Sequence, residues 1–242
     1  MGAGSQIGFE KSGASFDTLE AIAFTQLRPD HSADLPAYIG AAQSDTREQR
    51  LTIMGPTGDG ATNPSTRELI ERLFGPQGVY PYLADAFKPR SSLGYRVRSI
   101  DVPASGSKRW ARYQTERVKM TAIPVHHGDI PALAWRIEIA GQSIVITGSF
   151  NNSKNLVATF AKDADALVVS HAIPENSRGV LRDLYARPSQ LGRVADQADA
   201  RMMILGHRSV RTRGRESLSR NAIEENYNGT ILFANDGECW GL

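Results

Sequence analysis

Short apolar runs recur along this chain, and most of them end at a polar or glycine-containing segment. Such runs, bounded by turn residues, are typical of buried strands. In the first half of the chain they predict strands at 16–25 and 51–54. In the second half the predicted strands are 134–139, 143–147, 166–169, 202–205 and 230–234, with a hairpin turn at Gly141-Gln142 between the first two.

Helical spacing appears between these strands. It predicts helices at 66–74, at 156–161 and at 189–198, the last with Ser189 as its N-cap. Strands that alternate with helices predict an α/β fold in which helices cover the sheet faces. Residues 76–110 carry proline, glycine and aromatic residues with no clear period. We expect that segment to be an inserted loop or a cap within a single domain spanning residues 1–242.

The amino-acid composition limits which partners and metal sites the protein can have. The 242 residues are 40% hydrophobic, which is enough for a core, and 28 Lys and Arg nearly balance 26 Asp and Glu. This balance gives no global argument for a nucleic-acid or membrane partner. The single cysteine, Cys239, excludes both an internal disulfide framework and a cysteine-based zinc site. With no secretory signal and no apolar stretch of roughly 18 residues, we expect a cytoplasmic protein.

All five histidines follow apolar runs, at His31, His126, His127, His171 and His207. A single histidine in a loop is most often a surface residue. Five of them at strand ends favour a shared site, since polar groups at strand ends commonly converge. Asp30 and His31 are adjacent, so both could reach one metal ion from a tight loop.

Four segments together resemble the metallo-β-lactamase superfamily. Residues 24–36 resemble its metal-binding loop, Thr-His-x-His-x-Asp-His after an apolar strand, and 127–136 resemble its second ligand motif. Thr147-Gly148-Ser149 lies where the family has Gly-Asp-Thr, and Leu205-Gly206-His207 matches its last histidine motif. The likeness covers nearly the whole chain in order. It is closest to the branch of arylsulfatase-like hydrolases and tRNA 3′-end endonucleases.

The resemblance implies a fold and its variation. Family members form a four-layer αββα sandwich with one or two metal ions at the sheet edges. They usually begin with a pair of strands before the metal loop, and here Met1–Gln6 resembles only the end of that region. The resemblance therefore implies an N-terminally shortened version. Its sheet would be completed by a partner chain, as in a homodimer, or would have a remodelled edge.

Carried over by position, the resemblance also implies a ligand set. The first metal site becomes Gln26, Arg28 and His127, and Ser149 takes the bridging position. These are degenerate ligand positions at Gln26, Arg28 and Ser149, because a guanidinium has no lone pair and a neutral hydroxyl is a weak ligand. The second site keeps one carboxylate and two imidazoles, Asp30, His31 and His207. That set suits one Zn ion, or Mn or Fe.

Two functions remain open. In the first, the protein is a mononuclear hydrolase of an ester, phosphoester or similar bond that uses a metal-bound water. Catalysis would then involve Asp30, with Arg28 in place of the missing cation and His127 or His171 as proton carrier. In the second, it is a metal-free, inactive member that binds a ligand or a partner chain. Metal-independent chemistry at Ser149 is a third reading, but the flanking pattern of a nucleophile elbow is absent.

Basic segments bear on the substrate. Arginines cluster after the last histidine, and Arg208 and Arg211 are predicted to bind the substrate at the mouth of a pocket. Cations and aromatic residues also alternate over 108–113. Such patches can hold RNA, but the balanced net charge favours a solvated face. We therefore expect a small anionic or ester substrate and no membrane partner, with nucleic acid left as the less favoured reading.

Overall fold

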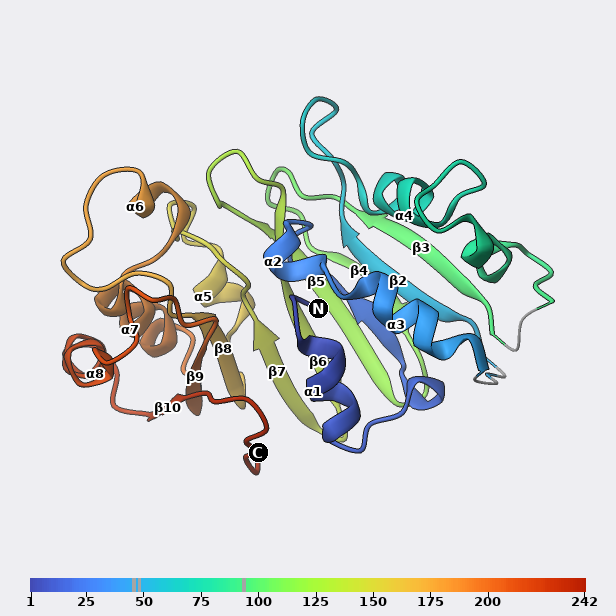
Figure 1. Cartoon of the computed structure of the whole chain (residues 1–242). Coiled ribbons are helices and arrows are strands. Elements are labelled where there is room, and N and C mark those ends of the chain that lie inside the picture. The colour runs from blue at the N-terminus through green and yellow to red at the C-terminus, as the bar shows by residue number, and fades with distance from the viewer. Residues whose placement is uncertain (45–46, 48, 93–94) are drawn as a thin grey trace. The chain divides into compact units, whose positions relative to one another are not determined.

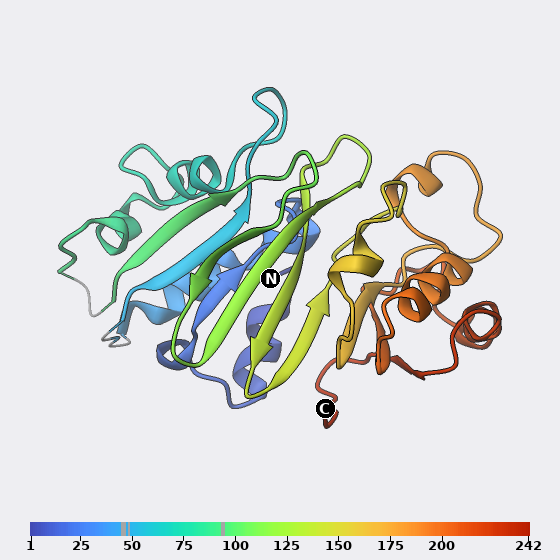
Figure 2. The same ribbon diagram turned by 180° about the vertical axis from the view of Figure 1, so that it is seen from behind.

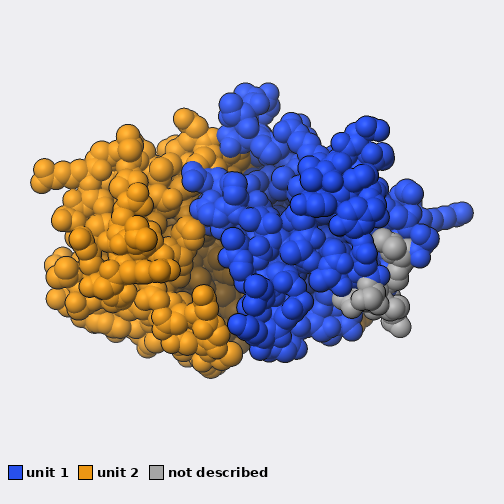
Figure 3. Space-filling view, in the orientation of Figure 1, with its two compact units in different colours: residues 1–103 blue, residues 104–242 orange. Residues whose placement is uncertain are grey.

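The computed structural model describes all residues of the chain except 45–46, 48 and 93–94. These residues divide into two compact units, Met1–Pro103 and Ala104–Leu242, which Figure 3 colours separately. Each unit has a sheet of its own (Figures 1 and 2). The single domain expected over residues 1–242 stays a prediction.

The first unit is built on a parallel three-stranded sheet in the order β1 (Ala21–Ala23), β2 (Leu51–Pro56), β3 (Val97–Val102). All six residues of β2 are buried, as expected for the central strand. The core of this unit contains Leu35, Ile39, Ile53 and Phe74. The unit's helices are α1 (Ser5–Lys11), α2 (Pro29–Ser32), α3 (Leu35–Ala41) and α4 (Thr66–Phe74), with 3₁₀ turns η1 (Phe16–Thr18), η2 (Ala42–Ser44) and η3 (Pro81–Phe87).

The helix α4 matches the predicted 66–74. The Ser65 side chain accepts a hydrogen bond from the Glu68 backbone, and the Glu68 side chain accepts one from the Ser65 backbone. This reciprocal capping satisfies two N–H groups that the first turn of a helix would leave without partners. The prediction of a helix that begins at a Ser/Thr start is therefore confirmed.

Two predictions for the first unit need correction. The strand predicted at 16–25 is only three residues long, because residues 16–18 form the 3₁₀ turn η1 and Phe16 packs edge-on against Tyr95 at 5.5 Å. The local side-chain bond from Ser15 to Asp17 favours this turn over an extended chain. In addition, the predicted inserted loop or cap at 76–110 does not include residues 97–102, since these form β3 and pair with β2.

The second unit contains a seven-stranded mixed sheet. Its order is β10-β9-β8-β7-β6-β5-β4, antiparallel from β4 to β7 and parallel from β7 to β10. The strands are β4 (Trp110–Gln114), β5 (Val118–Val125), β6 (Ala132–Ile139), β7 (Gln142–Ile146), β8 (Ala166–Ser170), β9 (Met202–Gly206) and β10 (Thr230–Phe233). The five strands predicted for this half are thus confirmed, with small shifts at their ends. Sequence reasoning missed β4, and it placed a strand end before His126 without giving bounds for β5.

Turn and cap chemistry explains the shifts. The hairpin turn lies at Ala140-Gly141, both with positive φ (50° and 78°), so Gln142 already belongs to β7. The predicted N-cap Ser189 instead lies inside its helix. The helix begins at Pro188, whose ring pre-sets the helical φ, and Ser189 donates its N–H and Oγ–H to Glu175.

Helices α5 (Val157–Phe160), α7 (Pro188–Gln197) and α8 (Glu216–Glu224) supply the core of the second unit, while α6 (Leu181–Leu184) has no buried residue. Helices α7 and α8 approach closely at Gly192. A Cβ atom added there would lie 2.6 Å from the carbonyl oxygen of Ile223. Leu167, Val194, Met203 and Ile223 are fully buried in this core.

In the part of the chain that the structure describes, no helix is both long enough and apolar enough to cross a membrane.

Candidate functional site

The first group of candidate residues follows β1 in the first unit. The chain leaves the sheet at Phe24, whose N–H still bonds to the carbonyl of Met54, and then enters α2 at Pro29. Proline at the first helical position has the φ that a helix needs and lacks an N–H that would have no partner. His31 therefore lies in a helical turn, whereas the sequence pattern predicted a loop.

The side chains of this segment contact one another. Arg28 Nε donates to Asp30 Oδ1 at 3.3 Å, and the other carboxylate oxygen of Asp30 lies 3.6 Å from His31 Nε2. Gln26 Nε2 lies 2.6 Å from the same His31 nitrogen. Partial burial raises the pKa of Asp30, but the neighbouring His31 and Arg28 outweigh it, so the pKa is lowered. Asp30 is thus a carboxylate at neutral pH.

The residues at the first metal position do not fit a metal ion. Gln26 is 1% exposed, and its amide nitrogen contacts His31. Its Oε1 is a buried acceptor that finds no hydrogen-bond partner among the described residues. Arg28 offers only N–H donors and a permanent positive charge, which repels a divalent cation. By contrast, Asp30 and His31 keep donor atoms of the types that zinc prefers.

His127 follows β5 in the second unit and is oriented by the backbone. Its Nδ1 lies 2.7 Å from the carbonyl oxygen of Leu184, and Tyr185 packs edge-on against the ring at 5.2 Å. A carbonyl can only accept, so Nδ1 carries the proton and Nε2 carries the lone pair. Gly128, with φ 59°, donates its N–H to the carbonyl of Asp183 and joins the two loops. His127 is therefore prepared to accept a proton or to bind a cation at Nε2.

Ser149 follows β7 and is 2% exposed. Its Oγ lies 3.4 Å from the Oγ of Ser170, which donates to the carbonyl of Gly148 at 3.1 Å. Within the described residues, the Ser149 hydroxyl has a second hydroxyl as its hydrogen-bond neighbour rather than an imidazole. This arrangement gives no support to Ser149 as an activated nucleophile, which needs an adjacent base.

His171 follows β8 and is enclosed by the core. The side chain is buried, its Nε2 lies 2.8 Å from Ser219 Oγ on α8, and Phe233 packs against the ring at 5.3 Å. The pKa of His171 is lowered to about 4, mainly by burial; the charge of Glu216 opposes this change and the charge of Arg208 adds to it. His171 is therefore neutral at neutral pH, and its hydrogen bond to α8 points to a structural role.

His207 follows β9 and has a left-handed backbone, with φ 48°. This conformation costs a non-glycine residue about 1–2 kcal/mol, so the surrounding loop must hold it in place. The next residue, Arg208, donates from Nη1 to Glu216 Oε1 at 3.1 Å and from Nη2 to Asn235 Oδ1. Arg211 is exposed, and its backbone N–H bonds to Ser209 Oγ.

Within each unit, the structure brings some candidate residues into contact. Gln26, Arg28, Asp30 and His31 contact one another in the first unit, and Arg208 contacts α8 in the second. The predicted ligands Asp30 and His31 belong to one unit and His207 to the other, so the three-ligand set stays a prediction. Sequence reasoning missed Leu184 and Ser219. A backbone carbonyl leaves no signal in a sequence, and no local pattern marked the side chain of Ser219.

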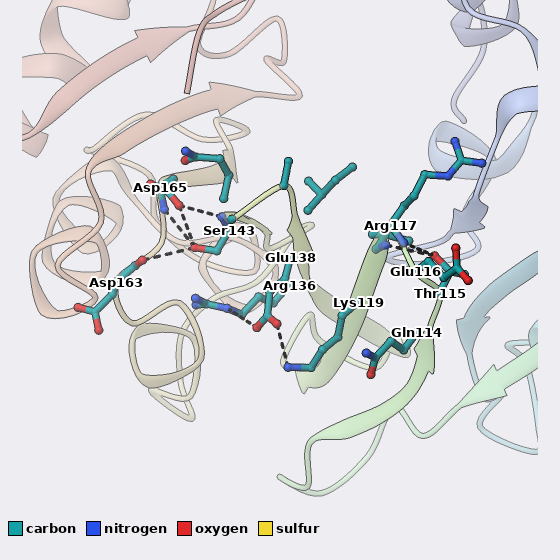
Figure 4. A pocket seen from close by; sticks show the side chains of 15 residues that line it. Gln114, Thr115, Glu116, Arg117, Lys119, Arg136, Glu138, Ser143, Asp163 and Asp165 are labelled. Carbon is teal, nitrogen blue, oxygen red and sulfur yellow. Dashed lines mark hydrogen bonds and ion pairs between the residues drawn. The ribbon is translucent and has the colours of Figure 1, made fainter.

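The second unit also has a pocket of about 490 Å³ (Figure 4). It lies at the ends of β5 and β6 that are opposite to His127, beside the hairpin turn at Ala140-Gly141. Glu138 lies between Lys119 at 2.8 Å and Arg136 at 3.5 Å, and Asp165 accepts from the Ser143 backbone at 2.8 Å. Glu138 is thus paired with Lys119 and Arg136, and no predicted site residue lines the pocket.

Comparisons with known proteins place these features in context. No family model matches the chain. A ribonuclease Z from Pediococcus pentosaceus is 25% identical over 233 residues, covering 82% of this chain and 73% of that protein. A ribonuclease Z from Natronomonas pharaonis is 23% identical over 267 residues, covering 98% and 85%.

Two solved structures are similar in fold. The short form of human tRNase Z superposes with a TM-score of 0.72 at 17% identity, covering 97% of this chain and 83% of that one. The zinc-bound PqqB from Methylobacterium extorquens gives a TM-score of 0.58 at 14% identity, covering 92% and 73%. At these identities the structural likeness shows the fold alone.

Proposed function

Because this chain belongs to the metallo-β-lactamase superfamily, on the ribonuclease Z branch by distant homologues and structural neighbours, we propose that it is a metal-dependent phosphodiester hydrolase. The predicted α/β metallo-β-lactamase fold is confirmed by the solved structures. The observation that carries the proposed activity is His127. Its Nδ1 is held by a backbone carbonyl, so Nε2 is set as an acceptor before any substrate arrives.

The residues that would hold the metal are Asp30, His31 and His207, a carboxylate and two imidazoles. This donor set suits one zinc ion, or manganese or iron, with a coordination position left open. Gln26 and Arg28 do not suit a second ion, so we propose one metal at most. When bound, that ion supplies Lewis acidity. The similar PqqB structure is described as zinc-bound, which supports zinc as the first metal to test.

Arg28 supplies a fixed positive charge beside the proposed ligands. Its Nε is engaged by Asp30, and its side chain is 47% exposed. A guanidinium has five N–H donors, so donors beyond Nε remain to bind the oxygens of a phosphodiester. Arg28 would thereby stabilise negative charge that develops on the phosphoryl oxygens. The exposed Arg211 offers a second cation for an anionic substrate.

Proton transfer falls to His127 in this proposal. Its Nε2 can accept a proton while Nδ1 stays bonded to the Leu184 carbonyl, and the imidazolium that forms keeps that hydrogen bond. His171 was an alternative proton carrier by sequence. Its burial and its bond to Ser219 support a structural role instead, so we do not include it in the mechanism.

The test is a metal-reconstitution assay on the full chain. Purified protein is stripped, reconstituted with zinc, manganese or iron, and assayed on bis(p-nitrophenyl) phosphate and on p-nitrophenyl acetate, with metal content measured by elemental analysis. We expect about one equivalent of metal and metal-dependent phosphodiester hydrolysis. Because removal of a residue that only orients a ligand costs 10–100-fold, Asp30→Asn should lower kcat/KM by at least about 100-fold and reduce the bound metal.

Asp163→Asn is the matched control. Asp163 is exposed and has a left-handed backbone, φ 55°, which asparagine tolerates well. It should keep wild-type metal content and rate. Less than about a tenth of an equivalent of metal in the reconstituted wild type would overturn the proposal, since a three-ligand site should bind tightly. Hydrolysis of the acetate ester alone would contradict the phosphodiester assignment.

A second candidate function has its own observation. Arg28 contacts Asp30, and Gln26 contacts His31, so the retained donors have partners within the protein even without a metal. This supports a metal-free member that binds a ligand or a partner chain, including a second copy of this chain. Absence of both metal and hydrolysis in the same assay would favour that function.

A further inference from the structure

We propose that Arg208 is a positioning residue that holds the His207 loop, rather than a contact for the substrate. The proposal rests on the proposed function in one respect, because it treats His207 as a metal ligand. Sequence reasoning assigned Arg208 to substrate binding because it lies in an arginine-rich segment. The contacts of its guanidinium within the second unit lead to a different role.

The guanidinium of Arg208 is already engaged at both ends. Nη1 donates to Glu216 Oε1 at 3.1 Å, in the first turn of α8, and Nη2 donates to Asn235 Oδ1, just after β10. Asn235 is itself fixed by Glu238, which accepts from its backbone N–H at 3.0 Å and from its side-chain amide at 2.6 Å. The Arg208 side chain is only 22% exposed. A planar fork that bridges two acceptors in this way cannot turn toward a substrate without breaking both contacts.

The rest of the loop is attached to the same part of the unit. Ser209 Oγ donates to the carbonyl of Ala172 at 2.7 Å, and Thr212 Oγ1 donates to the carbonyl of His171 at 2.7 Å. The backbone N–H of His171 donates in turn to the carbonyl of Gly206 at 2.8 Å. The segment from Gly206 to Thr212 is therefore held on both sides of His207.

This attachment matters because the backbone of His207 is in an unfavourable conformation. A φ of 48° is uncommon for a non-glycine residue, and in a free loop the residue would relax toward negative φ. Relaxation would rotate the imidazole away from its present direction. Arg208 follows His207 directly, and its side chain links the backbone at this position to α8 and to the segment after β10. Its role is thus to keep the ring of His207 aimed in one direction.

The experiment compares Arg208→Ala, Glu216→Gln and Asn235→Ala in the full chain, with Arg213→Ala as control. Arg213 is an exposed arginine of the same loop. Two readouts are used: zinc affinity by competition with a chromogenic chelator, and hydrogen–deuterium exchange of peptides covering 206–212 in the metal-free protein. Removing an orienting partner typically costs 10–100-fold in metal affinity, so we expect Arg208→Ala to weaken zinc binding about tenfold or more.

The exchange data separate positioning from general destabilisation. Arg208→Ala should speed exchange in 206–212 while peptides from α7 and β8 exchange as in the wild type. Arg208→Lys should restore part of the zinc affinity, because one ammonium can reach Glu216 or Asn235 but cannot bridge them. The double variant Arg208→Ala/Glu216→Gln should bind zinc as well as Arg208→Ala alone, because both substitutions remove the same Arg208–Glu216 interaction.

Several results would overturn the proposal. If Arg208→Ala raises KM and leaves zinc affinity and exchange unchanged, Arg208 contacts the substrate. If Arg213→Ala matches Arg208→Ala in both readouts, the effect comes from loop charge rather than from the bridge. If the wild type binds no zinc, the proposed function fails, and exchange alone decides this proposal: unchanged exchange at 206–212 in Arg208→Ala contradicts it.

Discussion

The loop after β1 and the strand ends of the second unit hold their polar residues in different ways. In the first unit, Asp30 and His31 are contacted by other side chains, Arg28 and Gln26, and Asp30 is 42% exposed. In the second unit, His127 is bonded to a backbone carbonyl and His171 is buried against α8. Side-chain partners can move when a ligand competes for the same atom, whereas a backbone partner stays in place. The difference teaches that the loop after β1 is adjustable, whereas the backbone contact that orients His127 is fixed.

The second unit also contrasts two histidines of equal burial. His127 and His171 are each 1% exposed. His127 donates through Nδ1, which leaves Nε2 as its acceptor, while His171 uses Nε2 for Ser219 and is shifted strongly toward its neutral form. The partner of each ring, rather than the degree of burial, thus separates the histidine that we propose as a proton acceptor from the one with a structural role.

The largest effect that tests this contrast is the pH dependence of stability at His171. Its folded-state pKa of about 4 lies below the ordinary value of 6.5, so the folded protein disfavours the protonated ring. The stabilising effect of the neutral ring is fully present above pH 6.5 and is lost as the pH falls from 6.5 toward about 4. Over that range we expect the free energy of unfolding of the wild type to fall by at most about 3 kcal/mol because of His171. In His171→Gln this part of the pH dependence should be absent.

Urea unfolding at a series of pH values measures this effect. Ser219→Ala is the control, because it removes the hydrogen bond and leaves the ring buried. That variant should be less stable at every pH and should keep most of the acid-dependent loss. Equal slopes for wild type and His171→Gln between pH 6.5 and 4 would show that His171 is not the buried neutral group described above.

A smaller effect, about 1 kcal/mol, tests the left-handed backbone at His207. Glycine accepts the left-handed backbone without a steric cost and alanine does not, so His207→Gly should be more stable than His207→Ala by about this amount. Metal-free protein is used, and unfolding in urea gives the difference. At Arg213, where φ is not positive, the same pair of substitutions should give the reverse order. If alanine is as stable as glycine at 207, the loop does not impose the strain.

The smallest effect concerns the adjustable loop. The Arg28–Asp30 pair is about half exposed, and pairs of this kind contribute less than about 1 kcal/mol. Arg28→Ala removes a competing cation from Asp30, and we expect zinc affinity to rise about threefold while phosphodiesterase activity falls. The exposed Arg50, in the same unit, is the control, and Arg50→Ala should change neither. A fall in zinc affinity for Arg28→Ala would mean that Arg28 helps to build the metal site.

Local signals were readable in the sequence. The capped helix α4 and the apolar strands of the second unit depend on neighbouring residues, so pattern and propensity suffice to predict them. The short β1 was not readable in this way. Its predicted run of residues includes Phe16, which takes part in a turn set by Ser15 and Asp17 and packs against the distant Tyr95.

The candidate site was readable only as a set of residue types. The partner of His127 is a carbonyl 57 residues further along the chain, and the partner of His171 is a serine 48 residues away. Neither pairing leaves a local pattern. The sequence indicated that each of these histidines follows a strand. The hydrogen bond that decides the role of each ring depends on tertiary contacts.

Gly192 connects the core to this chemistry. Because a Cβ there would lie 2.6 Å from the Ile223 carbonyl, the spacing of α7 and α8 is set by a missing methyl group. The helix on the far side of that contact carries both Ser219 and Glu216, the partners of His171 and Arg208. A Gly192→Ala substitution would therefore push α8 away from α7. That shift would change the His171–Ser219 and Arg208–Glu216 contacts, although residue 192 touches neither of them. The conformation of the His207 loop could therefore be altered by a substitution at Gly192, a residue that has no side chain.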